Sequence, residues 1–302
     1  MLHKLIYCIT FIYITASCRS SALPTRTLQS QIQHIISTKN AVVGVAIMGD
    51  DGRDTLSING HRHFPLQSVF KFHLGLAVLA RVDEGKLSLD QKVHISEHQL
   101  LPNLYSPLRE KYPKGGELTL SEIIEYTVAS SDNVGCDALI RLLGGPEELE
   151  DYFIKNGFKD ISIKYNEEDQ QANWNLQFHN WTTPVAANQV LQAFYKNHRE
   201  LLSKKSHAFI WKIMSQSTTG QRRLKGQLPA NIKIAHKTGS SGRNAEGITA
   251  AVNDIGVILL PNGRHFYISV FVTDSKESAE TNEKIIADIA KTAWNHFIKE
   301  LN

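Results

Sequence analysis

The sequence contains little cysteine. Only Cys8, Cys18 and Cys136 occur among its 302 residues, and the first two lie in or beside an apolar N-terminal segment. A single remaining cysteine cannot form an internal disulfide, which excludes the disulfide-stapled class of exported proteins. Cys136 stands among apolar residues in a helical pattern, so we expect a buried, inert thiol rather than a nucleophile.

The chain also has no excess of one charge. Its formal net charge is +3, with 33 basic and 30 acidic residues. The first 22 residues carry Lys4 and Arg19 and no acid, so their removal would leave a charge of +1. A nearly neutral protein has no electrostatic reason to bind nucleic acid, and we expect no such partner.

Long hydrophobic runs are missing as well. The apolar run from Leu5 to Ile14 follows Lys4 and precedes small residues, a pattern typical of a secretory signal peptide and too short for a membrane span. We predict a signal peptide at 1–22, a mature domain at 23–302, and a periplasmic or secreted monomer without a membrane span. Thr15-Ala16-Ser17-Cys18 loosely resembles a lipobox, so a lipid anchor at Cys18 stays open.

Motifs for cofactors are missing too. There is no Gly-rich phosphate-binding loop. His94 and His98 are four residues apart, and His61 and His63 flank an arginine, but no carboxylate or cysteine pattern completes a zinc site. We expect neither a metal nor another cofactor.

Strand patterns occupy both ends of the chain, and helical patterns lie between them. The predicted strands are 42–48, 55–58, 232–237, 248–260 and 266–272. Helices are predicted at 27–38, 69–83 and 278–298, and Thr119-Leu120-Ser121-Glu122 is a capping box. This order predicts a mixed α/β (α+β) fold with an antiparallel sheet built from both termini, flanked by helices. An all-α lobe (64–211) would be inserted into an α/β lobe (23–63 and 212–302), with a cleft between the lobes.

Three short motifs follow one another along the chain. In Ser68-Val69-Phe70-Lys71, the serine precedes a helix that is apolar on nearly every side, so Lys71 should be buried one turn from Ser68. A serine hydroxyl needs an adjacent base, and a lysine whose pKa is lowered by desolvation can serve. Ser131-Asp132-Asn133 lies in a turn, and Lys237-Thr238-Gly239 ends a strand. Read singly, each motif is an ordinary cap, turn or strand edge.

Together, the three motifs resemble those of the serine class A β-lactamases and penicillin-binding proteins, and a close resemblance to class A extends along the mature chain. It implies Ser68 as nucleophile, Lys71 as its partner and Ser131 as proton relay. Asn133 would hold the substrate's side-chain amide, and Asp132 would make structural hydrogen bonds. Lys237, Thr238 and Gly239 would bind the substrate carboxylate side, and the N–H groups of Ser68 and Ser240 would form the oxyanion hole.

The segment from Tyr165 to Trp181 is polar and has neither helical nor strand periodicity. It resembles the Ω-shaped loop of class A enzymes, whose glutamate activates the deacylating water. Counting back from Asn180-Trp181, as in the PER- and VEB-like extended-spectrum branch, places that glutamate at Glu167, with Glu168 as the alternative. Gln171 stands where the family has an asparagine that helps to hold the water.

Two further positions are assigned by resemblance. The strand after Lys-Thr-Gly lacks the usual family arginine, since its matching residues are Asn253-Asp254-Ile255-Gly256. Arg223 matches the substitute that the PER- and VEB-like branch uses. Tyr105 matches the aromatic residue at the cleft rim, although a plain core tyrosine is a comparable reading. His236 precedes the motif lysine and is expected to tune the strand edge rather than act as a base.

The sequence therefore predicts an exported serine β-lactamase acting on cephalosporins and penicillins through an acyl-enzyme. Whether Lys71 or Glu167 is the acylation base stays open. One rival is a D-alanyl-D-alanine peptidase, which shares all three motifs. The other is a lactam-sensing domain that acylates without turnover, which an incompetent loop at Gln171 would permit.

Overall fold

A five-stranded antiparallel sheet forms the backbone of the protein. The structure is a computed structural model that describes residues 22–52 and 55–299; the predicted signal peptide, apart from residue 22, and Cys18 lie outside these residues. The strands are ordered β2-β1-β10-β9-β8. Their bounds are β1 (Val42–Gly49), β2 (Thr55–Ile58), β8 (Ile234–Ser240), β9 (Val252–Leu259) and β10 (His265–Thr273).

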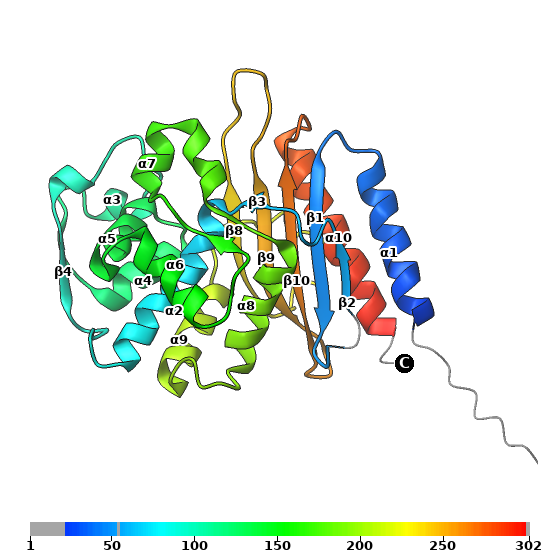
Figure 1. Cartoon of the computed structure of the whole chain (residues 1–302), viewed down its shortest axis with the longest axis horizontal. Coiled ribbons are helices and arrows are strands. Elements are labelled where there is room, and N and C mark those ends of the chain that lie inside the picture. The colour runs from blue at the N-terminus through cyan, green and yellow to red at the C-terminus, as the bar shows by residue number, and fades with distance from the viewer. Residues whose placement is uncertain (1–21, 53–54, 300–302) are drawn as a thin grey trace, which may run out of the picture.

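Helices from the two ends of the chain cover the outer face of this sheet. α1 (Ala22–Ser37) and α10 (Ala279–Lys299) lie side by side there (Figure 1). Ile32 of α1 and Ile289 of α10 are buried in one hydrophobic cluster with Val45 of β1 and Ile268 of β10. The sheet is thereby built from residues far apart in the sequence, as the pattern of terminal strands predicted.

The other face of the sheet adjoins a lobe of helices (Figure 1). Its α-helices are α2 (Phe70–Asp83), α3 (Pro107–Lys111), α4 (Leu120–Ala129), α5 (Asn133–Leu143), α6 (Pro146–Lys155), α7 (Glu167–Ala172), α8 (Pro184–Lys196) and α9 (Lys204–Ser215). The 3-10 turns are η1 (Gln67–Val69), η2 (Glu97–Gln99) and η3 (Trp174–His179). Two small antiparallel sheets join β3 (Phe64–Pro65), β7 (Trp181–Thr182) and β6 (Ile161–Ser162), and β4 (Lys92–Ile95) with β5 (Gly116–Thr119).

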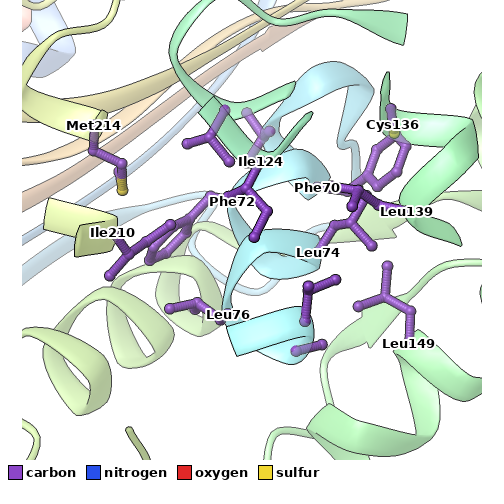
Figure 2. Packing of buried hydrophobic residues seen from close by; sticks show 14 of the residues in the cluster. Phe70, Phe72, Leu74, Leu76, Ile124, Cys136, Leu139, Leu149, Ile210 and Met214 are labelled. Atoms are coloured by element: carbon purple, nitrogen blue, oxygen red, sulfur yellow. The ribbon is translucent and has the colours of Figure 1, made fainter. Parts of the chain in front are cut away.

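α2 passes through the middle of this lobe. Every residue from Phe70 to Ala80 is buried, including Lys71 and His73. Apolar side chains of α4, α5, α6 and α9 surround it, as Figure 2 shows for Ile124, Leu139 and Leu149. The sequence predicted this burial because polar residues are nearly absent from the helix. Cys136 of α5 is also buried, and burial holds the pKa of its thiol well above the usual value.

The fold class is confirmed, while several element bounds differ from the predictions. α1 begins at Ala22 rather than at 27, and the first part of predicted strand 248–260 is irregular. There Thr249 instead forms isolated bridges with Arg243 and Ser275. The segment 165–181 contains α7 and η3, although no periodicity predicted them. None of the helices in the described part of the chain combines the length and apolarity that crossing a bilayer requires.

Candidate active site

The nucleophile candidate Ser68 lies in η1, the single 3-10 turn that leads into α2. Its neighbour Gln67 has a φ of 47°, a left-handed conformation that costs a non-glycine residue energy and is common at functional sites. Two distant residues hold this turn in place. The Asn180 backbone carbonyl accepts the Leu66 N–H at 2.8 Å, and the Asn253 side-chain amide donates to the Pro65 carbonyl at 2.7 Å. Ser68 is thus fixed at the end of a buried helix.

Lys71 is fully buried and lies between the nucleophile and a carboxylate. Its Nζ donates to Ser68 Oγ at 3.0 Å and to the Ser131 carbonyl at 2.9 Å, and it also contacts Asn133 Oδ1. Glu167 Oε1 lies 2.9 Å from the same nitrogen, and the Glu167 side chain is only 11% exposed. The first two motifs and the loop therefore meet at one ammonium group.

The expectation that desolvation would lower the pKa of Lys71 is wrong. Burial is the largest single influence and lowers the pKa. The charge and hydrogen bond of Glu167, with Cys136 and Asp132 acting in the same direction, together outweigh burial, and the pKa of Lys71 lies above its usual value. An opposite charge at this distance favours the charged form. In this state Lys71 donates to Ser68, and the carboxylate of Glu167 is the group able to accept a proton.

Ser131 and Asn133 flank a helix cap. Asp132 is the N-cap of α5 and accepts from Gly135 N at 2.7 Å, Leu108 N at 2.7 Å and Ser106 Oγ at 2.8 Å. Asp132 therefore makes structural hydrogen bonds, as predicted. Ser131 has a φ of 59°, so this turn is also strained.

The third motif places a second buried lysine opposite the first. Lys237 Nζ donates to Ser131 Oγ at 2.9 Å. Burial, with the charge of Lys71 nearby, holds the pKa of Lys237 well below its usual value. A Cβ at Gly239 would lie 2.6 Å from the Leu66 carbonyl, so glycine lets β8 pack against the nucleophile turn. The sequence had predicted a close approach at Gly239 by substrate, and the structure adds this approach by the protein's own backbone.

Arg223 is buried beside β8, with 8% of its surface exposed. Its guanidinium donates to the Gly239 carbonyl at 3.0 Å, the Asn253 carbonyl at 3.0 Å and Ser240 Oγ at 2.7 Å. Glu283 Oε1 lies 3.4 Å from Arg223 Nε. The positive charge is thus fixed at the end of β8, where the sequence predicted a carboxylate site.

The loop glutamate is presented by the first turn of α7. The buried Asp137 of α5 accepts the N–H of Glu167 at 2.8 Å and of Glu168 at 3.0 Å. Burial and the charge of Glu167 raise the pKa of Asp137 to about 7, although the two N–H groups oppose this. Glu168 is exposed, whereas Glu167 pairs with Lys71. The geometry favours Glu167 over Glu168 as the functional carboxylate.

These residues surround a cavity of about 360 Å³. Ten of the twelve site residues predicted from the sequence line it: Ser68, Tyr105, Ser131, Asn133, Glu167, Gln171, Arg223, Thr238, Gly239 and Ser240. Lys71 and Lys237 are buried and bonded to its lining through Ser68 and Ser131. Tyr105 is 56% exposed, which favours the rim over a core position.

The cavity also contains residues that the sequence did not single out. Gln67 donates to Gln177 Oε1 at 2.6 Å, and Gln177 donates to the Trp174 carbonyl at 2.7 Å, which joins η3 to the nucleophile turn. Thr219 bonds Thr238 at 2.6 Å between hydroxyls. Asp137, which lies behind Glu167 and outside the cavity lining, is the one residue for which the sequence carries a signal. An acidic residue on the apolar face of a helix requires a buried partner.

No described group of three or more histidine, cysteine, aspartate or glutamate side chains within 22–52 and 55–299 is arranged to hold a metal ion. The contacts described above bring together the hydroxyls of Ser68 and Ser131, the ammonium groups of Lys71 and Lys237, and the carboxylate of Glu167. A hydroxyl with a donor and an adjacent carboxylate is an arrangement for acyl transfer to serine.

Comparisons with known proteins agree with this arrangement. A family model described as the β-lactamase enzyme family matches residues 27–297. The chain is 52% identical over 276 residues to β-lactamase VEB-1 of Pseudomonas aeruginosa, covering 91% of this chain and 92% of that protein. It is 43% identical over 295 residues to the extended-spectrum β-lactamase PER-1 of the same organism, covering 97% and 94%.

Solved structures show the same likeness. The TLA-1 extended-spectrum β-lactamase superposes with a TM-score of 0.88 at 49% identity, covering 91% of this chain and 99% of that one. The TLA-3 enzyme gives a TM-score of 0.89 at the same identity and coverage. Motifs, fold and relatives agree, and the chain belongs to the β-lactamase enzyme family, with class A enzymes as its relatives.

Proposed function

We propose that this protein hydrolyses the amide bond of β-lactam antibiotics, cephalosporins and penicillins among them, through an acyl-enzyme on Ser68. The observation that carries the proposal is the chain of contacts from Ser68 Oγ through Lys71 Nζ to Glu167 Oε1, at 3.0 and 2.9 Å. A nucleophile, a proton donor and a buried carboxylate within such reach support two successive acyl transfers.

In the first half-reaction Ser68 Oγ bonds to the lactam carbonyl carbon. Its proton passes to the base, and the N–H groups of Ser68 and Ser240 hold the oxyanion. The carbon–nitrogen bond then breaks, and Ser131 delivers a proton to the nitrogen. The contact from Lys237 to Ser131 Oγ supports this relay, because a hydrogen bond donated to the hydroxyl oxygen stabilises that oxygen as its proton leaves.

In the second half-reaction Glu167 takes a proton from water, and the water oxygen bonds to the ester carbonyl carbon. The bond from that carbon to Ser68 Oγ then breaks, and the proton held by Glu167 returns to Ser68 Oγ through Lys71. The raised pKa of Lys71 favours Glu167 as the acylation base as well. Gln171 lies four residues after Glu167 in α7 and lines the same cavity, which supports a role in holding that water.

Substrate binding falls to the remaining lining residues. Asn133 would hold the side-chain amide, and Tyr105 would cover the rim. Lys237, Thr238 and Arg223 would meet the substrate carboxylate, for which a fixed cation is well suited. PER-1 and TLA-1 are called extended-spectrum β-lactamases, and by likeness to them we propose that cephalosporins are preferred substrates.

The cell location and organisation are also proposals. A signal peptide at 1–22 would direct a periplasmic or secreted monomer, with lipidation at Cys18 as the alternative. The mature chain would act as one domain of an α/β lobe (23–63 and 212–302) and an all-α lobe (64–211). Its partners would be small-molecule lactams, without cofactor or nucleic acid.

The test is turnover of a chromogenic cephalosporin by the purified mature protein. Wild type should hydrolyse many equivalents, and Ser68→Ala should neither turn over nor gain the mass of a bound penicillin, because only the nucleophile is lost. Asn175→Ala, on the exposed part of the same loop region, serves as a control that should retain turnover. A stoichiometric burst without steady turnover would instead identify a peptidase or a lactam sensor.

A further inference from the structure

A buried pair of ionisable side chains lies behind the carboxylate end of the cavity. His236 and Asp254 are both fully buried, and His236 Nδ1 lies 2.9 and 3.0 Å from the two carboxylate oxygens of Asp254. Neither residue lines the cavity. Placing a carboxylate away from water is costly unless it is paired and hydrogen-bonded, so the pair calls for an explanation.

The pair belongs to the face of the sheet on which Arg223 is fixed. Side chains two apart in a strand share a face, so His236, Thr238 and Ser240 of β8 point to the same side. Asp254 of β9 is the registered partner of Thr238 and shares that face. Lys237 points to the opposite side, where it reaches Ser131. Arg223 donates to Ser240 on the face of the pair.

The turn that carries Arg223 is fixed to this face on both sides of the arginine. Before it, the Thr219 and Thr238 hydroxyls lie 2.6 Å apart. After it, Leu224 N donates to Asp254 Oδ2 at 3.2 Å. Asp254 is therefore the attachment point for the residue directly following Arg223, and His236 fixes the carboxylate that makes the attachment.

The turn that carries Arg223 also packs closely against Thr238 of β8 and Asp254 of β9. A Cβ at Gly220, whose φ is 68°, would lie 2.4 Å from Thr238 Cγ2 and 3.5 Å from Asp254 Oδ2. The turn accordingly has little room to shift along the sheet without losing Thr238 or Asp254. A displacement of the turn would move the guanidinium away from Ser240 and the cavity wall.

We infer that His236 and Asp254 are positioning residues that set the place of Arg223 in the substrate-carboxylate site. The inference rests on the proposed function, since it assigns to the pair a share in recognising the carboxylate of the lactam. The pair acts through Arg223 and touches no reacting atom. A purely structural pair would affect stability alone.

Two boronic acids that bond reversibly to the nucleophilic serine provide the readout. One is phenylboronic acid, and the other is meta-carboxyphenylboronic acid. The ratio of their inhibition constants measures the carboxylate advantage independently of turnover. Asp254→Asn keeps the size of the side chain but loses an acceptor for His236 or Leu224, so we expect the advantage to fall about tenfold, within the range of a charge-assisted hydrogen bond. KM for a cephalosporin should rise more than kcat falls.

The matched variants separate positioning from general damage. His236→Leu should behave as Asp254→Asn does, while His236→Asn, which keeps a donor near the Nδ1 position, should restore most of the advantage. Asn188→Ala removes a buried partner of Ser269, 2.7 Å away and outside the cavity, and should leave the advantage unchanged.

A double-mutant cycle decides whether the pair works through the arginine. In an Arg223→Ala background, Asp254→Asn should reduce the advantage no further. Additive losses, or single variants that lower stability with an unchanged advantage, would overturn this inference alone. Failure of both boronic acids to inhibit wild type would instead overturn the proposed function, and this inference with it.

Discussion

At the scale of single residues, the main feature of the site is a small set of ionisable side chains that are largely removed from water. Lys71 and Lys237 are fully buried beside Ser68 and Ser131, and the carboxylate of Glu167 pairs with Lys71. Lys71 is held in its charged form by Glu167, while Lys237 is pushed toward its neutral form. The same residue type is therefore stabilised in its charged form at one position, while burial and a neighbouring lysine oppose its charged form at the other.

Arg223 allows a prediction at this scale. Arg223→Ala should raise KM for lactams with little change in kcat, because the carboxylate would lose a charge-assisted hydrogen bond of about 1.5–3 kcal/mol. Steady-state kinetics with one penicillin and one cephalosporin measures the effect. Arg62→Ala is the control, since Arg62 is an exposed partner of Asp274 outside the cavity. Unchanged KM in Arg223→Ala would show that the carboxylate is recognised without this arginine.

At the scale of elements, α2 carries two fully buried basic residues, Lys71 beside Ser68 and His73 two residues further on. His73 is fully buried, and burial lowers its pKa to about 4 despite its contact with the Val69 carbonyl. The unfolded chain takes up a proton near pH 6.5, which the folded helix resists until about pH 4. The contribution of neutral His73 to the free energy of unfolding is therefore fully present above pH 6.5 and is lost as the pH falls toward 4.

We predict that wild type loses about 3 kcal/mol more unfolding free energy than His73→Leu between pH 7 and pH 4, at 1.36 kcal/mol per pKa unit. Urea unfolding at each pH measures the difference. His198→Leu, which replaces an exposed histidine, should keep the wild-type pH dependence. Parallel pH profiles for wild type and His73→Leu would contradict the assignment of a neutral buried imidazole.

The loop from 165 to 181 is closed by Asn180. Its fully buried side chain accepts Lys164 N at 2.8 Å and Tyr165 N at 3.0 Å and donates to the Tyr165 carbonyl at 2.7 Å. Asn180→Ala should lower the free energy of unfolding by about 1–3 kcal/mol for each buried polar group left without a partner. It should also slow deacylation more than acylation, because α7 would no longer be held in position. Denaturant unfolding and rapid-mixing kinetics test both parts. Equal slowing of the two half-reactions would show that the loop does not position Glu167 selectively.

The elements also show where sequence reasoning ends. α2 and the sheet were predictable because apolar residues repeat at helical or strand spacing. α7 was not, since Glu-Glu-Asp-Gln-Gln-Ala has no apolar face and its helix is held by the Asn166 cap and by Asp137. Such long-range partners are set by the fold. The net effect of Glu167 on Lys71 was unpredictable for the same reason, as was the partnership of His236 with Asp254.

At the scale of the whole molecule, the helical region and the sheet each supply part of the proposed active site. The helical region contributes Ser68, Lys71, Ser131 and Glu167, and the sheet contributes Lys237. The resemblance of the three motifs and the loop to those of class A β-lactamases predicted this meeting, and in the structure each motif lies at an end of a helix or strand beside the cavity. The residues behind them, which fix their geometry, carried no motif and appear only in the structure.

The central claim is that a Ser68 acyl-enzyme forms and that Glu167 directs the water which removes it. The most direct test is intact-mass spectrometry of Glu167→Ala mixed with a good cephalosporin, with Glu168→Ala as the matched control. We predict that Glu167→Ala accumulates as a stable acyl-enzyme. Without Glu167, burial lowers the pKa of Lys71, so Lys71 can take the proton of Ser68 in acylation, while the water of deacylation loses its base. Glu168→Ala should turn over and show little adduct. Accumulation in Glu168→Ala with normal turnover by Glu167→Ala, or no adduct in either variant, would contradict the account.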